Sequence, residues 1–194
     1  MEVSSPAQIY QGQIQKHEAL LKKLQKKRNL LGWLRLLVFI ATIIASFKIF
    51  VAAGLIGLAP AILGLSVFIY FIFIDADNNE KITNTKTHIG INEEELRVLS
   101  NNFSNCNEGL NYLPTAHDYA HDLDIFGKVS VFQLINRCST EQGQKLLAKN
   151  LLHPLTRDEI IKRQEAAAEL SPMTEWRQQL QSFSRQTTLT ISTE

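Results

Sequence analysis

Residues 36–74 read LLVFIATIIASFKIFVAAGLIGLAPAILGLSVFIYFIFI, and this stretch decides the fold. Lys48 is its only charged side chain, although the chain carries 20 Lys and Arg and 19 Asp and Glu in its 194 residues. A bilayer core about 30 Å thick needs roughly 20 apolar helical residues at about 1.5 Å each. The stretch is long enough for two spans, so the sequence predicts a two-helix transmembrane hairpin over residues 30–74.

The reversal between the two predicted helices falls at small residues. We expect helices over about 30–50 and 55–74, because the Ala-Ala-Gly sequence at 52–54 suits a short reversal of the chain. The alternative is a single span over 49–74, with residues 30–47 lying in the membrane interface.

Lys48 and Pro60 are the residues that a membrane helix tolerates least well, and both fall near predicted helix ends. The aliphatic stem of Lys48 lets its ammonium group reach the interface from there. Pro60 falls in the first turns of the second helix, where the missing N–H disrupts the backbone least. Both positions therefore fit the hairpin.

The charges beside the hairpin predict its orientation. Cytoplasmic flanks of membrane spans are rich in Lys and Arg, and the segment before the first span is basic. Its cations are Lys16, Lys22, Lys23, Lys26, Lys27, Arg28 and Arg35. Because two spans return the chain to the same side, we expect both termini on the cytoplasmic side of the inner (cytoplasmic) membrane.

Residues 1–29 are predicted to form a basic juxtamembrane helix. Residues that suit a buried face recur there and just beyond at helical spacing, namely Ile14, His17, Leu21, Leu24 and Leu31. Three interpretations stay open: a solvated helix that sets the topology, a helix that contacts anionic lipid head groups, or a short coiled-coil seam with Arg28 at an a-type position.

Charge and cysteine content exclude several classes of protein. The basic and acidic residues nearly cancel, which excludes a strongly basic nucleic-acid binder. Cys106 and Cys138 are the only cysteines, which excludes a disulfide-framework domain and suits a reducing compartment. The chain has no P-loop, no dinucleotide-binding glycine motif and no nucleophile elbow. We therefore expect the chain as given not to be an enzyme.

The polar segment 75–91 is predicted to be a linker or an extension of the second helix out of the membrane. A helical domain is expected over residues 92–194. Asn92 followed by Glu95 resembles a capping box that opens its first helix. The apolar face of that helix would carry Leu96, Leu99 and Phe103.

Helical spacing returns after Ser130. Val131, Leu134, Ile135 and Cys138 follow the i, i+3, i+4, i+7 pattern, which predicts a helix that buries Cys138 as a small apolar side chain. The only strand-like alternation in the domain is at 123–126.

Three later helices are predicted from their end signals. Capping-box pairs open the first two, Ser139 with Gln142 and Thr156 with Glu159. The pairs that stop these helices, and the cap of the third, are His153-Pro154, Ser171-Pro172 and Thr174.

His117-Asp118 and His121-Asp122 form the sharpest candidate site in the chain. On a helix, His117 and His121 would share one face, as metal ligands must, and the chain would then be a metal-dependent enzyme. The alternative is a polar loop whose acids contact nearby backbone amides, because Pro114 lies just upstream and no glutamate has the spacing of a zinc protease base.

The basic residues near the C-terminus are interleaved with acids and glutamines. They are predicted to lie on solvated helix faces, with contact to phosphate as the alternative. These residues are Arg157, Lys162, Arg163, Arg177 and Arg185.

A series of short motifs over roughly residues 92–183 resembles a known family. The motifs are LDIFG at 123–127, SVFQLINRCST at 130–140, Gly143, Leu146-Leu147, LLHPL at 151–155, Ile160 and RQE at 163–165. Together they resemble the start of the helical core (lever) domain of the MutS mismatch-repair ATPase family. The chain is most similar to the membrane-anchored MutS-like proteins, which place a hydrophobic hairpin where the mismatch-reading domain would be.

The chain departs from the family pattern in several places. It has no Phe-x-Glu wedge motif, Asn150 stands where tryptophan is common, and Val129 stands where glycine is common. The clamp, the rest of the lever and the Walker-type ATPase would follow residue 194. The nucleotide-binding and catalytic residues of the family therefore map onto no residue here.

The resemblance implies a mainly α fold, with the hairpin at 30–74 followed by a partial MutS-like core over 92–194. It implies that the whole protein binds mismatched or structured DNA as a homodimer, with ATP and Mg as cofactors. For the chain itself we expect contact with a membrane, no cofactor and no ATP binding. The alternative function is a small, non-enzymatic membrane scaffold whose helical part binds a protein partner.

Overall fold

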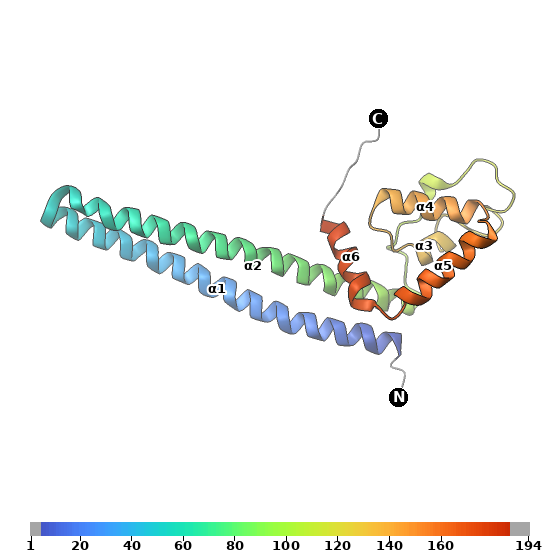
Figure 1. The fold of residues 1–194 in the computed structure, drawn as a ribbon, viewed down its shortest axis with the longest axis horizontal. Coiled ribbons are helices and arrows are strands. Elements are labelled where there is room, and N and C mark those ends of the chain that lie inside the picture. The colour runs from blue at the N-terminus through green and yellow to red at the C-terminus, as the bar shows by residue number, and fades with distance from the viewer. Residues whose placement is uncertain (1–4, 187–194) are drawn as a thin grey trace. The chain divides into compact units, whose positions relative to one another are not determined.

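The computed structural model describes residues 5–186, and every regular element in that range is helical (Figure 1). The predicted all-helical fold is therefore confirmed for these residues, and the strand-like alternation at 123–126 forms turns instead. The described chain divides into two compact units. One is residues 15–86, and the other is residues 5–14 together with 87–186.

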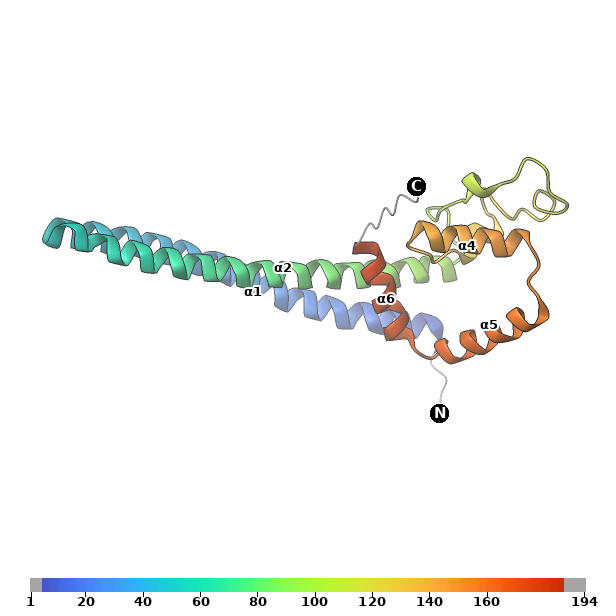
Figure 2. The same cartoon turned by 45° about the horizontal axis from the view of Figure 1, so that its top comes forward.

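Two long helices form a hairpin. Helix α1 spans Pro6–Ala53, the short 3-10 helix η1 spans Gly54–Gly57, and helix α2 spans Leu58–Leu99. Gly54 has a φ of 61°, a left-handed conformation that glycine adopts at little cost, and it starts the reversal where the sequence predicted it. Within residues 15–86 the two helices lie side by side in both views (Figures 1 and 2).

The helices continue beyond the apolar stretch at both ends. Residues 75–91 lie inside α2, so the helix-extension alternative describes their backbone. Asn92 lies in the interior of the same helix, so the predicted capping box with Glu95 is wrong. The helix ends at Leu99, and Asn101 has a φ of 59°, so Phe103 lies beyond the helix instead of on its face.

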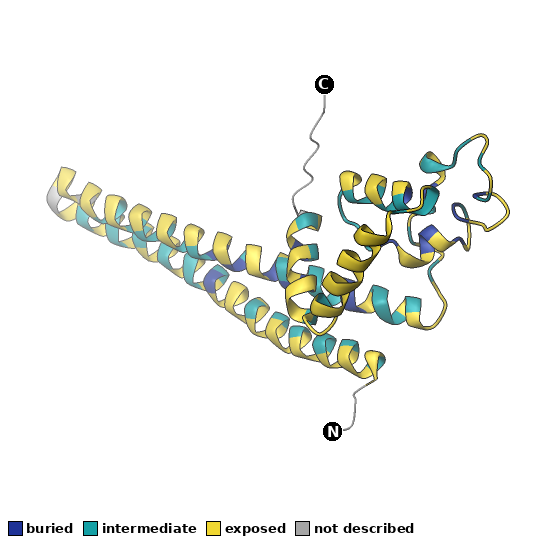
Figure 3. Ribbon diagram, turned by 45° about the vertical axis from the view of Figure 1, so that its right-hand side comes forward, coloured by how far each residue is buried: buried dark blue, intermediate teal, exposed yellow. Residues whose placement is uncertain are grey.

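The hairpin packs along a regular seam, whose residues are less exposed than their neighbours (Figure 3). On α2 the spacing alternates between three and four residues, as in a coiled coil. The seam residues of α2 are Ala61, Gly64, Phe68, Phe71, Asp75, Asn78, Ile82 and Thr85. Those of α1 include His17, Leu21, Leu24, Leu31, Val38, Thr42, Ala45 and Ile49. His17, Leu21, Leu24 and Leu31 of the predicted apolar face thus lie on a seam within the same chain, whereas Arg28, the predicted a-type position, is exposed.

The helices approach closely at Gly64. A Cβ atom at position 64 would collide with the hydroxyl and methyl groups of Thr42. The Thr42 hydroxyl donates a 2.7 Å hydrogen bond to the carbonyl oxygen of Val38, so it is satisfied within its own helix. Small residues permit such close contact between helices in an apolar medium.

The outer faces of the hairpin are apolar and exposed. Both helices are long and apolar enough to cross a membrane. In the most apolar segment of each helix, no residue is buried. Phe47 and Phe73 are each 70% exposed, and Leu55 is 78% exposed. Single exposed apolar residues are ordinary on soluble proteins, whereas a continuous belt of them is not.

The core of the second unit is small and aromatic. Ala120, Ile125, Phe126, Phe132 and Ala148 are buried together. The rings of Phe126 and Phe132 lie 5.3 Å apart between centroids. Gly109 has a φ of 66°, and a Cβ there would lie 2.5 Å from the Phe132 ring, so this position requires glycine on both counts.

The described part of this unit also contains short helices. They are η2 (Leu110–Tyr112), α3 (Val131–Ile135), α4 (Glu141–Leu152), α5 (Arg157–Leu170) and α6 (Thr174–Gln186). The capping box of Thr156 and Glu159 at the start of α5 is confirmed. Helices α4 and α5 end before His153 and Ser171, as predicted.

The predicted ends of α3, α4 and α6 differ from the structure by a few residues. Helix α3 ends at Ile135 because Asn136 is extended, so Cys138 does not lie on a helix face. Helix α4 is capped by Thr140, whose side chain accepts a hydrogen bond from the Gly143 amide, and Ser139 lies before the cap. Thr174 is the first residue of α6 and not its preceding cap.

Candidate functional site

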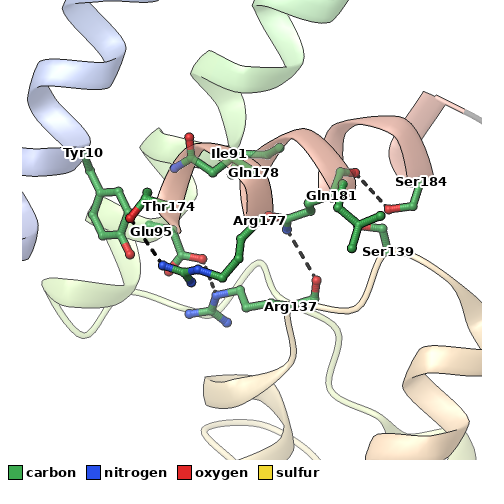
Figure 4. A pocket seen from close by; sticks show the side chains of 11 residues that line it. Tyr10, Ile91, Glu95, Arg137, Ser139, Thr174, Arg177, Gln178, Gln181 and Ser184 are labelled. Carbon is green, nitrogen blue, oxygen red and sulfur yellow. Dashed lines mark hydrogen bonds and ion pairs between the residues drawn. The ribbon is translucent and has the colours of Figure 1, made fainter. Parts of the chain in front are cut away.

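The described part of the second unit contains one well-formed polar pocket, at the junction between the end of α2 and helix α6 (Figure 4). Its volume is about 290 Å³. The lining residues are Tyr10, Ile91, Glu95, Arg137, Ser139, Thr174, Arg177, Gln178, Leu180, Gln181 and Ser184. Nearly all of these side chains are polar, so this junction is a candidate functional site.

A pair of side-chain amides joins α2 to α6 at this junction. Gln178 Nε2 donates to Asn92 Oδ1 at 2.7 Å, and Asn92 Nδ2 donates to Gln178 Oε1 at 3.2 Å. The Asn92 amide also donates to the His88 carbonyl oxygen at 2.8 Å. Asn92 is fully buried and Gln178 is 6% exposed, so these bonds are shielded from water.

Ion pairs join the same elements. Arg137 Nε donates to Glu95 Oε1 at 2.7 Å, with the two side chains 27% and 20% exposed. Arg185 forms an ion pair with Glu94, the residue beside Glu95 on α2. Gln181 Nε2 donates to the Arg137 carbonyl oxygen at 3.4 Å. The segment after α3 is thus tied to α2 and α6 at once.

Arg177 and Tyr10 complete the pocket wall. Arg177 Nη2 donates to the Ser171 carbonyl oxygen at 3.1 Å and to Thr174 Oγ1 at 3.4 Å. Burial raises the pKa of the Tyr10 hydroxyl, and the Glu95 carboxylate adds to the rise. The phenol is therefore protonated at neutral pH.

The pocket presents one carboxylate, two guanidinium groups, amides and hydroxyls. No histidine or cysteine lines it, and its two guanidinium groups already bond to protein oxygens. Within residues 5–186 no group of three His, Cys, Asp or Glu side chains is placed to hold a metal ion. The arrangement fixes the positions of three segments relative to one another within this unit.

The His-Asp residues do not converge in the described structure. Residues 115–124 form turns, with no helix to place the two histidines on one face. His117 Nε2 lies 3.0 Å from the Leu152 carbonyl oxygen, and His121 Nε2 lies 3.1 Å from the Pro114 carbonyl oxygen. Among the described residues, no hydrogen bond or ion pair joins Asp118 or Asp122 to either ring. The geometry here matches a polar loop that binds backbone groups.

Both cysteines are free and partly buried. Burial raises the pKa of the Cys106 thiol, and the neighbouring Glu94 carboxylate raises it further. Burial alone raises the pKa of Cys138. Since the thiolate is the reactive form, neither thiol is activated as a nucleophile.

The C-terminal basic residues divide into two groups. Arg157, Lys162 and Arg163 are exposed on α5, as predicted. Arg177 and Arg185 are also exposed on α6, as predicted, and Arg185 in addition pairs with Glu94 on α2.

Val129 has a strained backbone. Its φ of 58° lies in the left-handed region, which a β-branched residue rarely adopts. Its amide donates a 2.8 Å hydrogen bond to Gln133 Oε1, just before α3 begins. The family that the motifs resemble commonly has glycine at this position. Glycine would suit this left-handed conformation.

The Asn92–Gln178 pair was missed at the sequence level, although a signal existed. Asn78, Thr85 and Asn92 recur every seven residues, and all three are buried on one face of α2. A polar residue at a fixed heptad position is typical of a packed helix seam. Read this way, Asn92 belongs to a helix interior and not to a cap.

Comparison with known families gives a match for one part of the chain. Residues 94–188 match the family model described as MutS domain III. The resemblance drawn from the motifs is therefore confirmed for that segment, which covers just under half of the chain. The curated proteins and the solved structures gave no match.

Proposed function

We propose that this chain is the membrane-anchoring and core-scaffold portion of a MutS-like DNA mismatch-repair protein. The observation that carries the proposal is the match of residues 94–188 to MutS domain III in a chain that also has an exposed apolar hairpin. Helix α2 contains residues of both the apolar hairpin and the matched segment, because it runs from Leu58 to Leu99 without a break.

The exposed surface of the hairpin supports membrane placement. Burying a Leu, Ile or Phe side chain is worth about 1.5–3 kcal/mol, and the hairpin leaves many of them uncovered. Trp33 is 66% exposed and Tyr70 is 64% exposed, and both lie near one end of the hairpin's apolar part. Tryptophan and tyrosine favour the interface of a bilayer. The basic segment before Leu36 supports an orientation in which that end, and both termini, lie on the cytoplasmic side of the inner (cytoplasmic) membrane.

The role proposed for residues 94–188 is mechanical. The amide pair and ion pairs of the α2–α6 junction join the helices to one another. By family resemblance the whole protein would bind mismatched or structured DNA as a homodimer and use ATP and Mg. Those activities would lie outside the residues described here.

Exposed apolar side chains on α5 and α6 support contact with further protein. Ile160 and Ile161 are 43% and 42% exposed, and Trp176 and Leu180 are 52% and 57% exposed. A scaffold helix in a larger core would cover such residues. The same surface would serve a protein partner if the chain acts as a small membrane scaffold.

The test is the size and location of the native polypeptide. An antibody raised against residues 92–194 should detect a band in the membrane fraction that resists alkaline carbonate extraction. A band several-fold heavier than 22.0 kDa would place the ATPase in the same polypeptide. A band at the mass of the chain itself would favour the scaffold that binds a protein partner, and a carbonate-soluble protein would contradict the anchor.

A second measurement addresses nucleotide. The purified chain should not bind ATP at micromolar concentration, because none of its segments carries a phosphate-binding loop. Saturable ATP binding by the chain alone would contradict the scaffold role.

A further inference from the structure

An open pocket of about 590 Å³ lies between α1 and α2 at the end of the apolar stretch. It belongs to the unit of residues 15–86. Its lining residues are Arg28, Asn29, Gly32, Trp33, Arg35, Leu36 and Asp75. Charged groups and apolar side chains thus meet in one hollow, which is unusual for the otherwise apolar surface beside it.

The charges in this pocket leave an excess of one cation. Arg35 Nη2 donates to Asp75 Oδ2 at 2.9 Å, and these side chains are 27% and 11% exposed. Asp75 therefore neutralises Arg35 and holds its guanidinium in place. Arg28 is exposed, and no ion pair or hydrogen bond joins it to another described residue. An occupant with one negative charge would balance the site.

The apolar wall specifies the rest of the occupant. Trp33 is 66% exposed and Leu36 is 46% exposed, and both lie beside the guanidinium groups. Indole rings favour the boundary between hydrocarbon and head groups, where one side is apolar and the other is wet. A molecule that fills this pocket must carry an anionic head and an apolar tail.

We propose that the pocket binds the phosphodiester of an anionic membrane phospholipid. Arg28 and the free edge of the Arg35 guanidinium hold the phosphate oxygens, because the planar guanidinium matches phosphate geometry. Trp33 and Leu36 contact the first part of the acyl chains. This inference rests on the membrane placement proposed above, and it adds a specific lipid site to it.

The test uses the indole of Trp33 as the reporter. The chain has two tryptophans, so the full chain with Trp176→Phe retains only Trp33. It is reconstituted in vesicles in which either phosphatidylglycerol or phosphatidylcholine carries bromine on its acyl chains, at equal mole fraction. Bromine quenches a nearby indole, so the ratio of quenching measures which lipid occupies the pocket.

The matched variants are Arg28→Gln and Lys27→Gln. Each removes one cation from the same turn of α1, but only Arg28 lines the pocket. We expect phosphatidylglycerol to be preferred over phosphatidylcholine by about fivefold, from one cation acting near the surface. Arg28→Gln should remove most of the preference, and Lys27→Gln should leave it nearly intact.

Four outcomes would overturn the inference, and they are distinguishable. Equal quenching by the two lipids means that no anionic lipid is selected. Equal loss in both variants means that only the general surface charge attracts the lipid. Loss of the preference in millimolar inorganic phosphate means that free phosphate is the occupant. Absence of quenching by either lipid means that Trp33 is not at a bilayer, which contradicts the proposed membrane anchor itself.

Discussion

Asn92 and Gln178 bond to each other twice through their side-chain amides, at 2.7 and 3.2 Å, although 86 residues separate them in the chain. Both are buried, so each amide relies on the other to satisfy its donors and acceptors. This pair ties the last turns of α2, just before the segment that matches MutS domain III, to α6 inside that segment. It is the clearest sign that α6 has a specific place in this unit.

The pair predicts a contrast between adjacent glutamines. Gln178→Ala leaves the Asn92 side-chain oxygen and one of its N–H groups without their partner and should destabilise the docking of α6 by about 1–3 kcal/mol. Gln179→Ala, at the exposed neighbouring position, should change it by less than about 0.5 kcal/mol. Amide hydrogen exchange over residues 174–186 measures both. Equal protection in the two variants would show that the amide pair does not hold α6.

The conformation of Val129 predicts a stabilising substitution. A residue other than glycine pays roughly 1–2 kcal/mol to adopt the left-handed region, so Val129→Gly should stabilise this unit by about 1 kcal/mol or slightly less after the added flexibility of the unfolded chain. Val131→Gly, two residues away at the start of α3, should destabilise it. Urea unfolding monitored by the fluorescence of Trp176 measures the stability of both variants. A destabilised Val129→Gly variant would mean that the valine side chain contributes more by packing than it costs in strain.

The close approach at Gly64 predicts a position-specific effect of a single methyl group. Alanine is favoured over glycine in helices by about 1 kcal/mol, so Gly32→Ala should be neutral or stabilising, because its added Cβ would meet nothing within 4 Å. Gly64→Ala should instead loosen the hairpin, since its Cβ collides with Thr42.

Thermal unfolding in mild detergent, followed by circular dichroism, compares these two glycine variants. The double variant Thr42→Gly with Gly64→Ala should recover much of the lost stability, because it returns the space that the methyl group takes. If Gly64→Ala behaves like Gly32→Ala, the helices do not pack at Gly64.

The capping box of α5 predicts a dependence on pH. Hydrogen bonds from the Thr156 side chain and backbone lower the pKa of Glu159 in the folded chain from its ordinary value of 4.5. A carboxyl group with a lowered folded pKa stabilises the fold above its unfolded pKa, and that stability is lost as the pH falls through the folded pKa.

Protection of the α5 amides from hydrogen exchange should therefore fall as the solution is acidified from neutral pH past 4.5. Thr156→Ala should lower the protection at neutral pH and flatten this dependence, and Glu165→Gln on the same helix should do neither. A steep pH dependence that persists in Thr156→Ala would assign the effect to another group.

The strongest local signals in the sequence correctly predicted parts of the fold. Gly54 follows two alanines in a long apolar run, so the reversal of the hairpin was visible. Thr156 with Glu159 was also visible, because a capping box depends only on residues three apart. In both cases the physical cause is local.

The remaining features depend on tertiary contacts. Asn92 reads as a cap until Gln178, far along the chain, is known to bury it. Ser139 and Thr140 are equivalent cap candidates by type, and the extended segment after α3 decides between them. Arg185 reads as an unpaired surface residue because its partner, Glu94, lies 91 residues away on α2. Local pattern cannot distinguish a solvated arginine from one held in a junction.

The central claim is that residues 36–74 cross a membrane twice with both ends in the cytoplasm, and cysteine accessibility tests it most directly. In a Cys106→Ser, Cys138→Ser background, single cysteines are placed at Leu55 in the reversal, Gln11 before the hairpin and Gln179 on α6. A membrane-impermeant maleimide should label the Leu55→Cys variant in intact cells, and the Gln11→Cys and Gln179→Cys variants only after the membrane is opened. Labelling of Gln11→Cys and Gln179→Cys on opposite sides, or of all three only after opening, would contradict the two-span anchor.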